Sequence, residues 1–147
     1  MAHKYANVLV HVVFSSKERR NLIPPELESK LWRYIDGIGA NSRIPVLAVG
    51  GMPNHIHILV ALPSDISVAT AVRTFKANSS RWMGEHNIKF AWQEGYGAFS
   101  VSASNRKDVK NYIKRQREHH ARRSYEDELI ALLQKSGVTY DPAEVFG

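Results

Sequence analysis

The chain has 147 residues, of which 44% are hydrophobic and 23% charged, a balance typical of one globular domain rather than of a disordered segment. It contains no cysteine, which excludes a disulfide framework, a zinc–thiolate site and a catalytic cysteine. The net charge is +6, and because residues 106–123 carry eight basic and two acidic groups, the sequence indicates either a polyanionic partner such as nucleic acid or a solvated basic helix face.

The first half of the chain predicts one helix among three strands. An unbroken β-branched and apolar run near the N-terminus indicates a buried strand, and two consecutive prolines then open a helix, because a first helical turn tolerates proline. A glycine-rich segment with proline and asparagine joins two further strands into a hairpin. In chain order, the predicted elements are a strand at 8–14, a basic turn at 15–21, a helix from 24 to about 41, a strand at 45–49, a turn at 50–54 and a strand at 55–60.

The second half predicts more helix than strand. Ser104 or Asn105 can cap a basic helix, with Asp108 placed for a capping-box-like contact. Ser124 can cap a last short helix. In chain order, the predicted elements are a loop at 63–67, a helix from 68 to about 85, a strand-like segment at 90–101 interrupted at Gly95 and Gly97, a helix from 106 to about 123, a short helix at 126–135 and an irregular tail after Gly137.

The order of these elements is typical of an α+β fold of the ferredoxin-like, split βαβ kind. The order β-α-β-β-α-β predicts one antiparallel sheet with two helices on one face, and the tyrosine-bearing basic helix then follows the last strand. Because the sequence has no repeat, low-complexity tract or linker, we expect a single domain over 1–147. Its core spans about 6–125, and the short C-terminal helix and tail occupy 126–147.

Two histidines lie two positions apart in the predicted strand at 55–60. Side chains with this spacing point to the same face of a sheet, so the imidazoles of His55 and His57 can bind one divalent cation together. Ile56 and Ile58 then point to the opposite face and are expected in the core. Taken alone, such a pair is more often two surface histidines than a metal site.

One tyrosine and one glutamine lie four positions apart in the predicted basic helix, so Tyr112 and Gln116 share a helical face. A tyrosine oxygen can attack a DNA phosphodiester and leave a 5′-phosphotyrosine and a free 3′-OH. Because the phenol pKa is ordinarily ~10, the attack needs a base, a nearby positive field or a metal-polarised phosphate. Gln116 can add an amide oxygen to a histidine site. Without the histidines, Tyr112 is better explained as a ring that packs on an amphipathic helix.

Together these segments resemble the HUH family of single-tyrosine transposases. The stretch 53–60, Pro-Asn-His-Ile-His-Ile-Leu-Val, resembles the HUH motif of a hydrophobic residue between two histidines. The stretch 112–116 resembles the tyrosine helix of that family, and the segments 11–19 and 92–96 are similar to its first strand and to the approach to that helix. The family contains small transposases of certain bacterial insertion sequences and their domesticated relatives associated with repetitive extragenic palindromes. The resemblance covers roughly residues 6–125.

The resemblance implies a metal-dependent enzyme that cleaves and rejoins single-stranded DNA at hairpin-flanked element ends. It implies that His55, His57 and Gln116 bind Mg²⁺ or Mn²⁺, and that Tyr112 is the nucleophile. It also implies single-stranded DNA hairpins as partners. A homodimer is expected, in which the tyrosine helix of one subunit can complete the site of the other.

Several other polar residues are expected outside the chemistry. His119 and His120, near the end of the basic helix, are given no catalytic role, and Tyr125 lacks a glutamine four positions further on. Six basic residues are candidates for contacts with DNA phosphates, or else belong to solvated helix faces. These are Lys17, Arg19, Arg73, Lys76, Arg81 and Arg115.

Two other functions stay open on the sequence. One is a domesticated protein that binds DNA hairpins and no longer cleaves them. The other is an RNA-binding ferredoxin-like module, which would use a basic surface and exposed aromatic side chains. No apolar run approaches the ~20 residues of a membrane span, and the N-terminus has no signal-peptide pattern, so we expect a cytoplasmic protein without a membrane partner.

Overall fold

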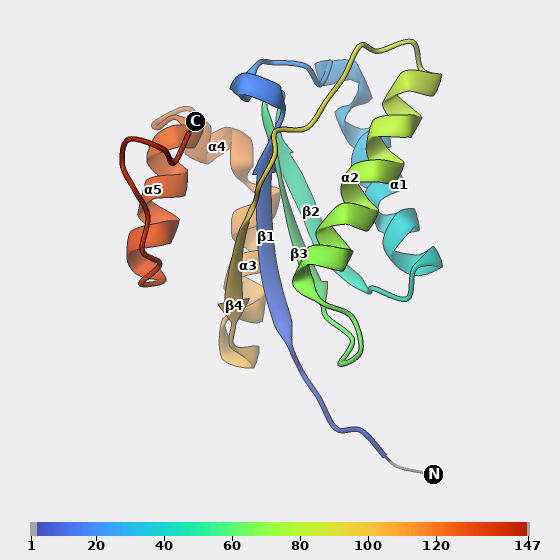
Figure 1. Cartoon of the computed structure of the whole chain (residues 1–147), viewed down its shortest axis with the longest axis vertical. Coiled ribbons are helices and arrows are strands. Elements are labelled where there is room, and N and C mark those ends of the chain that lie inside the picture. Colours follow the sequence, from blue (N-terminus) through green and yellow to red (C-terminus); the bar gives the residue numbers. More distant parts are fainter. Residues whose placement is uncertain (1–2, 147) are drawn as a thin grey trace.

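Residues 3–146, which the computed structural model describes, form a sheet of four antiparallel strands with helices on both faces (Figure 1). The strands are β1 (Leu9–Ser15), β2 (Val46–Met52), β3 (His55–Ala61) and β4 (Gly97–Val101). They lie in the order β2-β3-β1-β4, and every neighbouring pair is antiparallel. This order confirms the predicted α+β, ferredoxin-like arrangement.

Two groups of helices enclose the sheet (Figure 1). The helices are α1 (Glu28–Asn41), α2 (Val68–Glu85), α3 (Arg106–Lys114), α4 (Gln116–His120) and α5 (Tyr125–Lys135), with short 3₁₀ helices η1 (Lys17–Arg19), η2 (Pro25–Leu27) and η3 (Ala103–Asn105). α1 and α2 pack on one face, as predicted, whereas α3, α4 and α5 lie on the other. In the described part of the chain, no helix is long and apolar enough to cross a membrane.

Alternate residues of β3 divide between the two sides of the sheet. Ile56 and Ile58 join the apolar core beneath α1 and α2, as predicted. His55 and His57 therefore face α3, α4 and α5 on the opposite side. Both imidazoles are fully buried, so they are not a surface pair. The fold thus places the histidines between the sheet and the three helices that follow β4.

The predicted helix from 106 to 123 is wrong in its extent, because the chain breaks it at Arg115. Arg115 has φ −105° and ψ 31°, and its N–H bonds back to carbonyls of the preceding turn, so α3 ends at Lys114. α4 then begins at Gln116, whose side chain is buried against His55. Helical periodicity contains no information about that tertiary contact, which explains why the sequence pattern joins the two helices.

Two further boundaries differ from the prediction. The strand expected at 90–101 is reduced to β4, because Gly95 adopts a left-handed φ of 88° that interrupts extended backbone. Before that point, Trp92 forms only an isolated bridge with Ser16. β2 continues through the glycines that were expected in the turn, as far as Met52, and leaves only two residues to turn the chain into β3.

The two predicted helix caps have different outcomes. Asn105 makes no side-chain cap hydrogen bond at the start of α3, and the hydroxyl of Ser104 lies 3.0 Å from that of Ser102 instead, so the expected cap with its capping-box contact from Asp108 is wrong. The 3₁₀ turn η3 precedes α3 directly and supplies backbone hydrogen bonds there instead. Ser124 does cap α5, because its hydroxyl accepts a hydrogen bond from the N–H of Asp127 at 3.1 Å.

Candidate active site

The predicted metal ligands and the predicted nucleophile meet in one cluster between the sheet and α3, α4 and α5. β3 supplies His55 and His57, α3 supplies Tyr112, and α4 supplies Gln116. The two histidines and Gln116 are buried, and Tyr112 is partly exposed. Four residues that are up to 61 positions apart in the chain therefore converge on one site.

His55 and Gln116 contact each other directly. The Nε2 atom of His55 lies 3.0 Å from the amide oxygen Oε1 of Gln116. On the other side of its ring, His55 Nδ1 lies 2.8 Å from Oδ1 of Asn54, which holds the imidazole in place. In the tautomer whose Nδ1–H donates to that oxygen, the lone pair of Nε2 faces the cluster. This is the atom that a metal ion would use.

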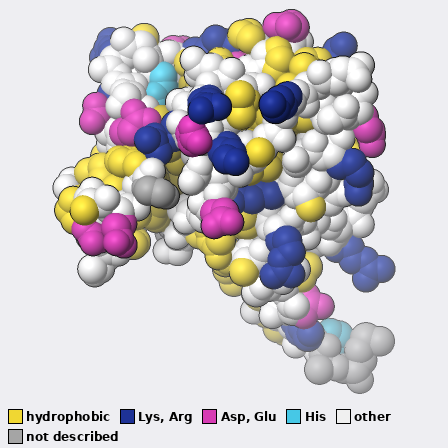
Figure 2. Space-filling model, turned by 45° about the horizontal axis from the view of Figure 1, so that its top comes forward, with side chains coloured by type: hydrophobic (Ala, Val, Ile, Leu, Met, Phe, Trp, Pro, Cys, Tyr) yellow, Lys and Arg dark blue, Asp and Glu magenta, His cyan; other side chains and the backbone are white. Residues whose placement is uncertain are grey.

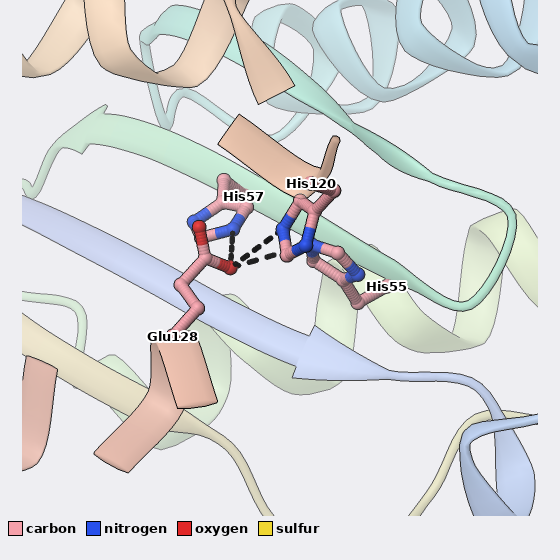
Figure 3. A group of neighbouring side chains, drawn as sticks. All are labelled: His55, His57, His120 and Glu128. Atoms are coloured by element: carbon pink, nitrogen blue, oxygen red, sulfur yellow. Dashed lines mark hydrogen bonds and ion pairs between the residues drawn. The ribbon is translucent and has the colours of Figure 1, made fainter. Parts of the chain in front are cut away.

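Glu128 of α5 is a member of the cluster that sequence reasoning missed. Its carboxylate is fully buried, and Oε1 lies 2.8 Å from Nε2 of His57 (Figure 3). Its other oxygen accepts a hydrogen bond from the hydroxyl of Tyr112. A signal for this position does exist in the sequence: Glu128 interrupts the helical stripe that begins with Tyr125 and continues at Leu129 and Leu132. A carboxylate in an apolar stripe must find a polar partner in the interior.

His120 also belongs to the cluster, although the sequence analysis gave it no role. Its Nε2 atom lies 3.1 Å from Oε1 of Gln116 and 3.2 Å from Oε1 of Glu128. Its Nδ1 atom lies 2.9 Å from the carbonyl oxygen of Arg123, which fixes the ring. The neighbouring His119 packs its ring on Tyr112, with 4.5 Å between the ring centroids. After the break at Arg115, His120 faces His55 of the sheet, with 4.6 Å between the ring centroids.

A second layer of the site is formed by His11 of β1. Its Nε2 atom lies 2.8 Å from Nδ1 of His57, within the buried interior. Burial, and then the neighbouring His57, lower the pKa of His11 to about 3. The ring is therefore neutral near pH 7, and a neutral imidazole can either donate or accept one hydrogen bond at Nε2, depending on its tautomer.

The charges in the cluster follow from burial and from the hydrogen bonds around Glu128. Burial works against ionisation of Glu128, but hydrogen bonds from the surrounding imidazoles outweigh it and hold the pKa of this carboxyl below its ordinary value. Burial also lowers the pKa of His57. For His120, burial is outweighed by Glu128, and the pKa is raised. The site is thus a buried carboxylate surrounded by imidazole rings.

Tyr112 is held as a protonated phenol. Burial, and then its hydrogen bond to Glu128, raise the pKa of Tyr112 to about 12. Arg123 acts in the opposite direction, because one of its guanidinium nitrogens donates to the phenol oxygen at 3.2 Å. The phenol oxygen thus has a hydrogen-bond acceptor on one side and a positive charge on the other.

The donor atoms of the cluster fit a divalent metal ion. His55, His57, His120 and Glu128 each offer one ligand atom, and these atoms all lie within 4.8 Å of one another. The amide oxygen of Gln116 lies beside them, in contact with His55 and His120. Imidazole nitrogens together with amide and carboxylate oxygens are a set that binds divalent first-row metals and magnesium.

A cavity leads to the nucleophile from outside. It has a volume of about 660 Å³ and lies between β4, α3 and α5. Its lining includes Tyr112, Arg123 and His11, together with Phe99 of β4 and Lys135 of α5. Cavities of this size accommodate ligands larger than a single ion. A substrate can therefore approach Tyr112 from this side, whereas His55, His57 and His120 are not part of the lining.

The six basic residues that were predicted to contact DNA lie in different environments. Lys76 is tied to the chain, because its ammonium group donates to the carbonyls of Gln93 at 2.8 Å and of Gly95 at 2.7 Å. Arg19 pairs with Glu126 at 3.2 Å, and its charge is partly neutralised there. The remaining four are exposed: Lys17, Arg73, Arg81 and Arg115. Figure 2 shows lysine and arginine side chains spread over the face that includes the upper end of the molecule in Figure 1, with acidic side chains among them.

Comparison with known proteins finds relatives over most of the chain. The family described as "Transposase IS200 like" matches residues 4–116. The transposase for insertion sequence element IS200 of Salmonella typhimurium is 27% identical over 126 residues, which cover 80% of this chain and 82% of that protein. The ISDra2 transposase TnpA of Deinococcus radiodurans is 23% identical over 119 residues, covering 72% and 81% of the two chains.

Solved structures share the same fold. A crystal structure of a candidate transposase from Deinococcus radiodurans R1 has a TM-score of 0.62 and 20% identity, covering 77% of this chain and 94% of that chain. The structure of a REP-associated tyrosine transposase bound to a REP hairpin has a TM-score of 0.55 and 18% identity, covering 77% and 68%. The family match ends at Gln116, so the helix that carries Glu128 lies beyond the matched segment.

Proposed function

Because this chain belongs to the family of IS200-like transposases, we propose that it cleaves and rejoins single-stranded DNA at hairpin-flanked element ends through a covalent 5′-phosphotyrosine at Tyr112. One observation carries the proposal: Tyr112, the histidine pair of β3 and Gln116 converge on a single site. The rings of Tyr112 and His57 are 5.9 Å apart between centroids, and His55 contacts Gln116 directly. A nucleophile beside a set of metal ligands is the arrangement that phosphodiester transfer requires.

The reaction exchanges one phosphodiester bond for another. The phenol oxygen of Tyr112 forms a bond to the phosphorus, and the bond from phosphorus to the 3′ oxygen breaks. The phenol loses its proton, and the departing 3′ oxygen takes up one proton to become the free 3′-OH. Arg123 donates a hydrogen bond to the phenol oxygen, so its charge stabilises the phenolate that develops during the attack. Rejoining is the reverse reaction, in which a 3′-OH attacks the phosphotyrosine. The energy of the bond is retained, so no nucleotide cofactor is needed.

His55, His57 and Gln116 are the residues that we propose to hold Mg²⁺ or Mn²⁺. When bound, the ion would withdraw charge from the non-bridging oxygens of the phosphate and make the phosphorus more electrophilic. The protein contributes by orienting these groups. Asn54 fixes the ring of His55, and His11 fixes the ring of His57 from behind.

The proposed partners are DNA hairpins and a second copy of the chain. Hairpin binding is supported by the fold shared with a REP-associated tyrosine transposase that is bound to a REP hairpin. The exposed residues Lys17, Arg73, Arg81 and Arg115 are the proposed phosphate contacts, with Arg19 and Lys76 available only if their present partners release them. A homodimer remains part of the proposal, but Tyr112 already meets the histidines of its own chain.

The first test is a denaturing gel with labelled single strands from the DNA that flanks the gene. The full-length protein is incubated with each strand in Mg²⁺ or in EDTA. We expect a protein-linked band that needs Mg²⁺ and is absent in Tyr112→Phe, because phenylalanine has no oxygen to attack the phosphorus. Tyr112→Phe is expected to retain hairpin binding in a filter assay, since the ring and its packing are kept.

Two control variants make the gel decisive. Tyr5→Phe removes an exposed tyrosine hydroxyl far from the cluster and is expected to leave the covalent band unchanged. His55→Ala is expected to reduce the band by about 10²-fold or more, because it removes a proposed metal ligand. A covalent band in Tyr112→Phe would rule out this nucleophile. Tight hairpin binding with no band on any strand would favour a binding protein that no longer cleaves, and EDTA-insensitive preference for RNA would favour an RNA-binding module.

A further inference from the structure

We propose that Glu128 of α5 is a further ligand of the metal site and positions the nucleophile, so that one carboxylate joins the metal to Tyr112. This inference rests on the proposed function, because it needs both a metal at the histidine pair and a reactive Tyr112. It adds a residue beyond the family match, which ends at Gln116. It also places a complete reaction centre within one chain.

The first argument is the position of the Oε1 atom of Glu128. This oxygen lies 2.8 Å from Nε2 of His57, 3.4 Å from Nε2 of His55 and 3.2 Å from Nε2 of His120 (Figure 3). Ligand atoms that share one ion with bonds of about 2.1 Å lie roughly 3.0–3.4 Å from one another in octahedral or tetrahedral geometry. The separations from His55 and His120 fall within this range, and the separation from His57 is slightly shorter.

The second argument is chemical. Two imidazole nitrogens and one amide oxygen are all neutral donors, and hard cations such as Mg²⁺ and Mn²⁺ prefer anionic oxygen ligands. Glu128 supplies that oxygen. Its side chain is fully buried, and a buried carboxylate is costly unless it is paired or coordinates a metal. A divalent ion would satisfy the carboxylate and the imidazoles that surround it at the same time.

The third argument concerns the second oxygen of the same carboxylate. Oε2 of Glu128 accepts the hydrogen bond from the Tyr112 hydroxyl and lies 3.3 Å from the amide nitrogen of Gln116. The two oxygens of Glu128 thus face different partners, the imidazoles on one side and the phenol on the other. The oxygen that holds the phenol and the oxygen proposed to bind the ion belong to the same carboxyl group. The distance between the phenol and a bound ion is therefore restricted.

α5 is anchored in a way that keeps Glu128 in place. Ser124 caps the start of the helix, and the ring of Tyr125 packs on His55 with 4.5 Å between centroids. Leu133, two turns further on, is buried in an apolar cluster with Val13 and Phe99 of the sheet. Contacts before and after Glu128 therefore fix it against the sheet, and its placement does not depend on the polar contacts alone.

The test separates metal binding from catalysis. Mn²⁺ binding to the full-length protein without DNA is measured from the electron paramagnetic resonance signal of free Mn²⁺. We expect Glu128→Gln to weaken Mn²⁺ binding by about tenfold or more, and Glu128→Asp, which keeps the charge on a shorter side chain, to weaken it less. Asp127→Asn is the matched control, since it neutralises the adjacent carboxylate, which is exposed. Thermal melts establish that each variant is folded.

The positioning role has its own readout. At saturating Mn²⁺, we expect Glu128→Gln to lower the kcat for covalent adduct formation at Tyr112 by about tenfold or more while the KM for DNA stays within twofold. Glu128→Asp is expected to restore part of this loss. Unchanged Mn²⁺ affinity in both Glu128 variants would overturn the ligand assignment, and an unchanged kcat would overturn the positioning role.

The same measurements keep this inference distinct from the proposed function. If the wild-type protein forms no covalent adduct but its Mn²⁺ binding depends on Glu128, the proposed function fails and the ligand assignment stands. If the adduct forms and Mn²⁺ binding is the same in wild type and Glu128→Gln, the proposed function stands and the ligand assignment fails.

Discussion

At the scale of single residues, His11 shows how an imidazole can act on the metal site through a neighbouring ring. Without a metal ion, the carboxylate of Glu128 accepts a hydrogen bond from Nε2–H of His57. The Nδ1 atom of His57 then has no proton and accepts a hydrogen bond from Nε2–H of His11. A metal ion at Nε2 of His57 requires the opposite tautomer, in which Nδ1 donates to His11. Because His11 is neutral, it can serve both arrangements by changing its own tautomer.

The buried state of His11 predicts how stability depends on pH. The pKa of His11 is 6.5 in the unfolded chain and about 3 in the folded protein, so the unfolded state binds the proton first as the pH falls. The stability that comes from the neutral ring is present above pH 6.5 and is lost between pH 6.5 and about 3. We expect the free energy of unfolding of the metal-free protein, measured by urea denaturation, to fall across this window.

The variant His11→Phe separates this effect from that of other titrating groups. Phenylalanine cannot take up a proton, so we expect a shallower fall in the free energy of unfolding between pH 6.5 and 3 than in wild type. His86→Phe is the control, because His86 is an exposed histidine directly after α2, and the variant is expected to keep the slope of wild type. Parallel slopes for wild type and His11→Phe would contradict the prediction.

At the scale of elements, the position of α3 depends on a glycine in β2. A Cβ atom at Gly50 would lie 2.3 Å from the backbone oxygen of Ile113, one residue after Tyr112. The bare backbone of Gly50 therefore lets α3 approach the strand closely enough to bring the phenol to the cluster. Ile113 is itself fully buried against this sheet face with Leu59 and Leu9. This explains why β2 runs through a glycine pair that resembles a turn.

Gly50→Ala is expected to displace α3 and to destabilise the protein. The added methyl group would overlap backbone, which cannot rotate away, and overpacking of this kind costs about 1–3 kcal/mol. We expect a lower free energy of unfolding, and a loss of covalent adduct that exceeds what the loss of folded protein explains. Gly37→Ala in α1 is the matched control, because a Cβ there meets nothing within 4 Å. It is expected to stabilise the helix by about 0.5–1 kcal/mol.

At the scale of the whole molecule, the site lies toward one end of the sheet, and the chain as a whole is basic. β1 ends and β3 begins at this end, which is the upper end in Figure 1, and Ser15 pairs there with His55. The chain carries a net charge of +6, and Lys17 of η1 follows β1 directly at the same end. The N-terminal segment extends from the opposite end (Figure 1). The net charge of +6 thus attracts a polyanion to the molecule as a whole.

This positive charge predicts that hairpin binding depends strongly on salt. We expect the logarithm of the association constant, measured by fluorescence anisotropy, to fall linearly with the logarithm of salt concentration. Arg73→Gln and Arg81→Gln are each expected to reduce the slope by about one, as for one lost phosphate contact. Lys4→Gln lies in the N-terminal segment and is expected to leave the slope unchanged. Unaltered slopes in both arginine variants would exclude α2 from the DNA interface.

Much of the scaffold could be predicted from the sequence, because the signals for it are local. A period of two residues placed His55 and His57 on one face of a strand and Ile56 on the other, and the structure confirms this. The spacing of four residues between Tyr112 and Gln116 predicted a shared direction, and both side chains do reach the cluster, although the chain breaks between them. The order of strands and helices likewise determined the sheet topology.

The tertiary structure alone decided which further groups surround the site. Glu128 reaches His57 across 71 positions of the chain, and His11 reaches it across 46. No local period links such residues, because the contact exists only when α5 packs on the face of the sheet opposite α1 and α2. The break at Arg115 has the same origin, since it turns Gln116 and His120 inward to His55. Periodicity determines the face on which a side chain lies, whereas packing between distant elements determines what that side chain meets.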